Sequence, residues 1–161
     1  MLQHDVLKIL EQDARTNTEK IAEMTGSSVD EVKAIITQAE ADGIIVRYKT
    51  VINWEKLGQE RVEAFIEVKI TPQRDVGFDA IAERVYKFNE ARSVYLMSGT
   101  YDLAVLVSGK TMHQVASFVS QKLAPIESVQ GTATHFMLKR YKEDGEILAG
   151  VEKANRQQVV L

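Results

Sequence analysis

The residues best suited to chemistry gather in one stretch, Val94 to Ser108, whose sequence is VYLMSGTYDLAVLVS. Two apolar runs rich in β-forming residues flank Ser98-Gly99-Thr100-Tyr101-Asp102, which predicts a hairpin connection. Gly99 can adopt a positive φ angle in such a turn, and Asp102 places a carboxylate at the start of the second strand. The pattern indicates either a turn with a strand-capping aspartate or a contact with a small ligand or another subunit.

The composition of the 161-residue chain limits its class. Hydrophobic residues make up 45% and charged residues 27%, as in an ordinary globular protein. No apolar run approaches the roughly 18–20 residues of a membrane span, and the N-terminal residues carry no export signal, so we expect a cytoplasmic protein without membrane contacts. The lack of cysteine excludes disulfides and a thiol nucleophile.

The net charge of −3 is unevenly distributed along the chain. The first 50 residues hold six basic and nine acidic side chains, whereas the remaining residues hold fourteen of each. The whole excess of negative charge therefore lies in the N-terminal third. Such an excess opposes binding to an anionic partner such as DNA.

Apolar residues at helical spacing predict three short helices in this N-terminal third. Thr16 is expected to cap the second helix and Ser28 the third, with an acidic capping-box partner three residues later. The run IIVRYKTVI predicts an extended strand. This order is that of a winged helix-turn-helix, although a small helical dimerisation module has similar elements. The helices are expected over residues 5–14, 18–25 and 28–42, and the strand over residues 44–52.

The rest of the chain predicts a different unit, because the hydrophobic period changes to two at Val62. Its elements follow the order β-α-β-β-α-β of a ferredoxin-like domain, so the chain as a whole is expected to be α+β. The predicted segments are a DNA-binding domain over 1–52, a linker over 53–61, the βαββαβ domain over 62–142 and a C-terminal extension over 143–161.

One face of the predicted sheet lacks a cover. Every residue from Leu103 to Val107 is apolar, which indicates that both faces of this strand are buried. The two predicted helices can cover one face only. We therefore expect the other face, which carries Phe65 and Ala104, to meet a second copy of the chain in an obligate dimer.

The segments DVLKILEQDART, NTEKIAEMTGSS and AEADGIIVRYKTVINWEKLG, followed by VYLMSGTYDLAVLV, resemble the Lrp/AsnC family of transcriptional regulators. The resemblance covers roughly residues 3–142, and the residues beyond it predict an added helix or tail. It implies a C-terminal domain of the RAM type and a protein that binds double-stranded DNA. It also implies homodimers that assemble further, into octamers or decamers, and an amino acid effector at subunit interfaces.

The resemblance also implies which residues bind the effector. An α-amino acid needs a carboxylate beside its ammonium group and clustered N–H or hydroxyl donors beside its carboxylate. Asp102 fits the first role, and the turn and strand residues fit the second. The implied effector site consists of Met97, Ser98, Gly99, Thr100, Tyr101 and Asp102, with Thr132 and Thr134 from a neighbouring subunit.

The predicted recognition helix departs from the family pattern. Ser27-Ser28-Val29 stands where the family has leucine-serine-proline, and Ile35 stands at the place of a family arginine. Acidic residues surround the few bases and should weaken binding to phosphates. The expected DNA contacts are base edges for Ser28, Lys33, Ala34 and Thr37, and phosphates for Arg47 and Lys49.

Two other functions remain open. The acidic N-terminal third fits an amino-acid-sensing oligomer that binds DNA weakly or not at all. A tetrapyrrole decarboxylase of similar layout would need histidines around one cavity, whereas His4, His113 and His135 share no spacing. We expect no cofactor, no metal and no enzymatic activity, because neither a catalytic triad nor a phosphate-binding loop is present in the sequence.

Overall fold

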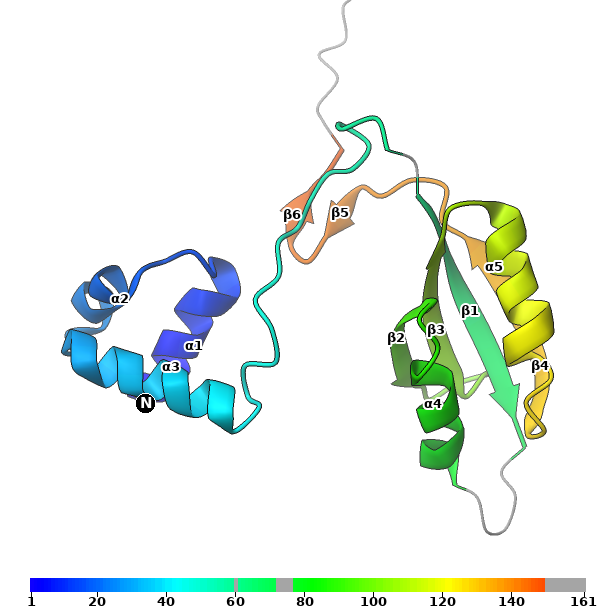
Figure 1. Cartoon of the computed structure of the whole chain (residues 1–161), viewed down its shortest axis with the longest axis horizontal. Coiled ribbons are helices and arrows are strands. Elements are labelled where there is room, and N and C mark those ends of the chain that lie inside the picture. The colour runs from blue at the N-terminus through cyan, green and yellow to red at the C-terminus, as the bar shows by residue number, and fades with distance from the viewer. Residues whose placement is uncertain (60, 72–76, 150–161) are drawn as a thin grey trace, which may run out of the picture. The chain divides into compact units, whose positions relative to one another are not determined.

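A computed structural model describes residues 1–59, 61–71 and 77–149 (Figure 1). The chain divides between Val51 and Ile52 into two units, each with its own hydrophobic core. The predicted domain boundary at residue 52 lies one residue from this division.

The first unit contains the three predicted helices, and their amphipathic spacing explains how they pack. They are α1 (Leu2–Gln12), α2 (Thr18–Thr25) and α3 (Val29–Ala41). Apolar side chains that recur every three or four residues fall on one side of each helix, where they are removed from water. The core consists of Val6, Leu10, Ile21, Ala22 and Val32.

Helix caps fix where α2 and α3 begin. The Asn17 side chain accepts a hydrogen bond from the Lys20 amide at 2.8 Å, so the cap of α2 is Asn17 and the prediction of Thr16 was wrong by one residue. Both residue types can cap a helix, and the extended backbone of Asn17 decides between them. The capping box of Ser28 and Glu31 is confirmed at the start of α3.

The strand predicted over residues 44–52 is not formed. A β-strand needs a neighbouring strand to pair its backbone groups, and the first unit contains none among its described residues. The Ile45 amide instead bonds the Ala39 carbonyl at 3.0 Å. Val46 is 90% exposed. The segment is therefore an exposed, β-prone connection that follows α3.

The second unit confirms the predicted β-α-β-β-α-β order. Its four main strands form an antiparallel sheet in the order β2-β3-β1-β4. A short π-helical segment, η1, continues α5. The elements are β1 (Val62–Ile70), α4 (Phe78–Tyr86), β2 (Ala91–Leu96), β3 (Leu103–Gly109), α5 (Met112–Phe118), η1 (Val119–Leu123) and β4 (Val129–Phe136).

Alternation along β1 separates the two faces of this sheet. One face carries Ala64, Ile66, Val68 and Ile70, which are buried in one cluster with residues of α4 and α5. The residues of α4 and α5 in this cluster do not pack on the opposite face, which is here called the open face. By register it carries Glu63, Phe65, Glu67, Lys69, Tyr95, Ala104, Leu106 and His135. The prediction that the helices cover one face of the sheet is confirmed.

At the start of the predicted C-terminal extension the structure has a small hairpin. Strands β5 (Lys142–Glu143) and β6 (Glu146–Ile147) pair across Asp144 and Gly145, both with positive φ. Such a two-residue turn matches the twist of the flanking strands. The predicted boundary at 142/143 falls inside this hairpin, and residues 150–161 of the predicted extension lie outside the described residues. None of the described helices has the length and apolar character of a membrane span.

Candidate DNA-binding and ligand-binding sites

The solvent-facing side of α3 carries the residues predicted to read base edges. Lys33, Ala34 and Thr37 are exposed and recur at helical spacing, whereas Val32 and Ala39 on the other side are buried. These three residues therefore share one face of the helix. Such a face is able to enter the major groove of DNA.

Ser28 has a structural task at the start of α3. Its hydroxyl donates to Glu31 Oε2 at 2.8 Å and accepts from the Glu31 amide at 3.2 Å. The Ser28 amide also donates to Glu31 Oε2, at 2.9 Å. The backbone and hydroxyl bonds from Ser28 lower the pKa of Glu31. Glu31 is therefore a charged cap at neutral pH, and the Ser28 hydroxyl is bound to it.

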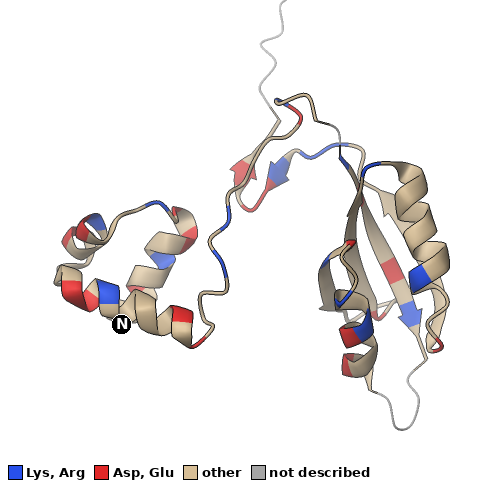
Figure 2. Ribbon diagram, in the orientation of Figure 1, with Lys and Arg blue, Asp and Glu red and all other residues tan. Residues whose placement is uncertain are grey.

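The charge around α3 is predominantly acidic (Figure 2). Asp30 and Glu31 lie in its first turn, and Glu40 lies near its end. The Tyr48 hydroxyl donates to Glu40 Oε1 at 2.8 Å, and the pKa of Tyr48 is raised by its burial and by this bond. The predicted phosphate contacts Arg47 and Lys49 are exposed in the segment after α3. The bases therefore lie mainly in that segment and the acids on the helix.

The predicted ligand-binding turn connects β2 and β3 and is largely open to solvent. Met97, Ser98, Gly99 and Thr100 are exposed. Gly99 has φ +147°, a conformation that side chains disfavour, so the predicted positive φ is confirmed. Tyr101 is half-buried at the end of the turn.

Asp102 is bound by backbone groups of β1. Its Oδ2 atom accepts a hydrogen bond from the Ile70 amide at 2.7 Å and lies 3.6 Å from Lys69 Nζ. The Asp102 amide donates to the Val68 carbonyl at 3.0 Å. The strand-capping role that the sequence left open for this aspartate is therefore present in the fold.

The two threonines predicted to complete the site lie on β4, away from the turn within one chain. Thr132 pairs with Val68 and Thr134 with Ile66, so both are on the helix-covered face of the sheet. The described chain does not bring these hydroxyls together with the side chains of the turn. Their predicted role in a neighbouring subunit's site stays a prediction.

The structure adds charged residues that the sequence reasoning did not assign to a site. Glu63 Oε1 lies 3.4 Å from Arg92 Nη1, and Glu63 Oε2 lies 3.6 Å from Arg140 Nη1. His135 Nε2 lies 3.3 Å from Glu67 Oε1. The alternation of VEAFIEVKI is a signal for this arrangement, because it places both glutamates on the face that carries Phe65. The open face thus combines ion pairs with aromatic side chains.

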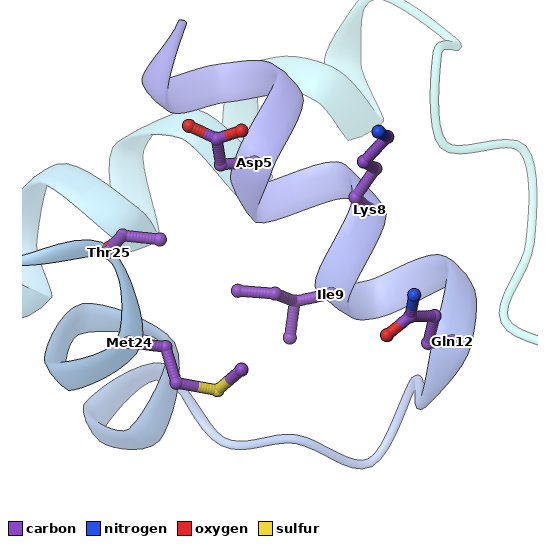
Figure 3. A pocket seen from close by; sticks show the side chains of 6 residues that line it. All are labelled: Asp5, Lys8, Ile9, Gln12, Met24 and Thr25. Carbon is purple, nitrogen blue, oxygen red and sulfur yellow. The ribbon is translucent and has the colours of Figure 1, made fainter.

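The first unit has a shallow hollow between α1 and α2 (Figure 3). Its walls come from α1 and α2, and the Thr25 hydroxyl on its rim bonds the Ile21 carbonyl of its own helix at 2.8 Å. Within the described ranges there is no group of three His, Asp or Glu side chains that could hold a metal ion. The hollow is lined by Asp5, Lys8, Ile9, Gln12, Met24 and Thr25.

Comparison with known proteins gives the family. The model of the Lrp/AsnC ligand binding domain matches residues 63–147, and a winged helix-turn-helix DNA-binding model matches residues 2–46. The chain is 51% identical over 144 residues to the uncharacterized HTH-type transcriptional regulator YugG of Bacillus subtilis, a match that covers 89% of this chain and 87% of that protein.

Two solved structures show the same fold. E. coli AsnC has a TM-score of 0.67 at 20% identity, with 88% of this chain and 93% of that chain covered. A transcriptional regulator from Neisseria meningitidis, in complex with L-Met, has a TM-score of 0.70 at 24% identity, with 88% and 91% covered. The chain belongs to the Lrp/AsnC family of transcriptional regulators, with a helix-turn-helix DNA-binding domain followed by a ligand-binding domain.

Proposed function

We propose that this regulator binds an amino acid as a small effector at the exposed turn between β2 and β3, at an interface between subunits. The observation that carries the proposal is the position of the turn: it adjoins the open face of the sheet, since Tyr101 packs against Phe65 of that face. The L-Met complex of the Neisseria regulator supports an amino acid as the ligand. The proposed site comprises Met97, Ser98, Gly99, Thr100, Tyr101 and Asp102, with Thr132 and Thr134 of the partner subunit.

The open face is the proposed interface of a homodimer. Phe65 and Leu106 are half-buried there, and Tyr95 is 52% exposed. A sheet face with such side chains is stabilised when a second sheet removes them from water. Two copies of this face would supply aromatic and apolar contacts at the centre. Dimers formed in this way could assemble further, into octamers.

We propose that the protein acts in the cytoplasm by binding double-stranded DNA. It does not catalyse a reaction in this proposal. Lys33, Ala34 and Thr37 form the exposed face of α3, and Arg47 and Lys49 follow it for contacts with phosphates. A ligand that binds one assembly state more tightly shifts the population toward that state. The proposed consequence is a changed presentation of the paired helix-turn-helix domains.

A second candidate function is an amino acid sensor with weak DNA binding. The acidic residues of α3, Asp30, Glu31 and Glu40, favour it because they repel phosphates. The decarboxylase alternative has less support, because His113 lies on α5 and His135 on the open face, which are on opposite sides of the sheet. These two imidazoles do not share a cavity wall.

The test of the regulator against the sensor is a gel shift with the DNA upstream of the protein's own gene, over a series of salt concentrations. We expect binding at low salt that weakens steeply as salt increases. No shift at any salt concentration would favour the sensor. Calorimetry with each of the twenty amino acids tests the ligand, and the complete absence of heat would contradict an amino acid effector.

A further inference from the structure

Asp102 is joined to its surroundings through its side chain and through both of its backbone groups. Its carboxylate oxygen Oδ2 accepts from the Ile70 amide at 2.7 Å. Its own amide donates to the Val68 carbonyl at 3.0 Å, and its carbonyl accepts from the Met97 amide at 2.8 Å. The first two bonds attach the residue to β1, and the third closes the turn. Asp102 thus connects the two ends of the turn to each other and attaches the turn to β1.

The side-chain bond lies where the ladder between β1 and β3 ends. The final pair of that ladder is Val68 with Leu103, and Ile70 lies two residues beyond it. The register of β1 against β4 also shifts at Lys69 and Ile70. With no further residue of β3 opposite Ile70, a carboxylate takes the place of the backbone acceptor that a longer strand would supply. The Asp102 side chain is 20% exposed, so this bond is partly shielded from water.

The negative charge of Asp102 is also matched within the chain. Lys69 Nζ lies 3.6 Å from Asp102 Oδ2, the same oxygen that the Ile70 amide contacts. Because Lys69 is 48% exposed, this ion pair contributes little to stability, but it keeps a cation beside the carboxylate. A ligand ammonium group would therefore enter next to a charge of its own sign.

We infer that Asp102 is a positioning residue, which fixes the turn Met97–Tyr101 for the ligand and is not the partner of the ligand's ammonium group. The inference rests on the proposed function, because it assigns a role within the proposed amino acid site. It reverses the role that the family resemblance implies for this residue. What the ligand site requires from Asp102 is an acceptor for the Ile70 amide, and a negative charge is not needed.

Two substitutions separate the acceptor from the charge. Asp102→Asn keeps an oxygen that can accept from the Ile70 amide, but presents an NH₂ group that cannot accept a bond from an ammonium group. Asp102→Ala removes the acceptor and the charge together. Amide hydrogen exchange of the full-length protein reports whether the Ile70 bond persists. We expect protection at Ile70 and at Met97, whose amide bonds the Asp102 carbonyl, to be kept in the Asn variant and reduced in the Ala variant.

Ligand affinity is then measured by calorimetry with the amino acid that the unsubstituted protein binds. We expect the Asn variant to bind within about threefold of the unsubstituted protein and the Ala variant to bind at least about tenfold more weakly, as for loss of one hydrogen bond that orders a site. Val85→Ala is the matched control for general destabilisation, because Val85 is buried in α4 away from the turn. Its ligand affinity should not change.

The inference is overturned if the Asn variant loses ligand binding while Ile70 stays protected, because the charge would then be the contact. It is also overturned if the Ala variant keeps full affinity, or if Ile70 exchanges equally in all three proteins. A protein that binds none of the twenty amino acids contradicts the proposed function instead. In that case the exchange at Ile70 and in the turn still decides whether Asp102 fixes the turn.

Discussion

Phe65 and Tyr101 pack edge to face, with ring centroids 6.0 Å apart and ring planes at 81°. Phe65 belongs to β1 on the open face, and Tyr101 ends the turn between β2 and β3. On its other side Phe65 lies 6.2 Å from the ring of His135 on β4. One aromatic row therefore connects the proposed dimer interface with the proposed ligand site. A change of contacts at one of these sites can therefore alter side-chain packing at the other.

The dimer prediction is tested with a charge on the open face. Leu106 is half-buried beside Phe65, and Leu106→Glu would place a carboxylate within the proposed interface. We expect the dissociation constant of the dimer to increase at least about 100-fold, because a charge buried without a partner is costly. Sedimentation equilibrium measures it. The control is Tyr86→Glu on α4, where Tyr86 is 58% exposed. An unchanged dimer in the Leu106 variant would contradict the proposed interface.

The turn prediction uses the positive φ of Gly99. A Cβ atom at Gly99 would meet no atom within 4 Å, so the cost of Gly99→Ala comes from φ +147° alone. We expect a loss of about 1–2 kcal/mol in the free energy of unfolding, or a rearranged turn, together with weaker ligand binding. Urea unfolding and calorimetry measure the two effects. Gly131→Ala is the matched control, since Gly131 also has open space but no positive φ. Equal effects of both substitutions would contradict this reasoning.

The DNA prediction concerns the acids of α3. Asp30 is exposed in the first turn, and removal of its charge in Asp30→Asn should reduce the repulsion of phosphates. We expect about two- to fivefold tighter DNA binding at low salt and a smaller gain at high salt, where charges are screened. Fluorescence anisotropy with labelled duplex DNA measures this. The control Glu11→Asn removes a charge from α1, elsewhere on the same unit. An identical gain in DNA affinity in this variant would show that the effect comes from the net charge and not from the position of Asp30 on α3.

The pH prediction follows from the cap of α3. Bonds from Ser28 hold the pKa of Glu31 below its ordinary value of 4.5. A lowered pKa in the folded state means that the ionised carboxylate stabilises the helix above that ordinary value, and that this contribution is lost as the pH falls through the folded-state pKa. We expect the protein to melt at a higher temperature than its Glu31→Gln variant at pH 7 and at about the same temperature near pH ~2.

Circular dichroism of both proteins over this pH range checks the prediction. The Gln variant keeps the size of the side chain and lacks the ionisable group, so the difference between the two melting temperatures isolates the charge. A difference that stays constant from neutral to acidic pH would show that the charge of Glu31 does not contribute through the cap.

Local patterns in the sequence determined the elements and their order. The helical spacing in the first third and the alternation of VEAFIEVKI predicted α1 to α3 and β1, and the Ser28–Glu31 spacing predicted the capping box. These features depend on interactions between residues three or four apart, or on one strand's two faces, which the sequence displays directly. The same local patterns placed Gly99 in a turn that needs a positive φ.

Tertiary structure decided the features that depend on pairing between distant segments. Residues 44–52 have the composition of a strand, but a strand forms only where another strand satisfies its backbone groups. The sequence predicted that the Asp102 carboxylate contacts a ligand. The fold places this carboxylate against the Ile70 amide, 32 residues away. Which partner meets a polar group depends on the register of the whole sheet, and no local spacing contains that register.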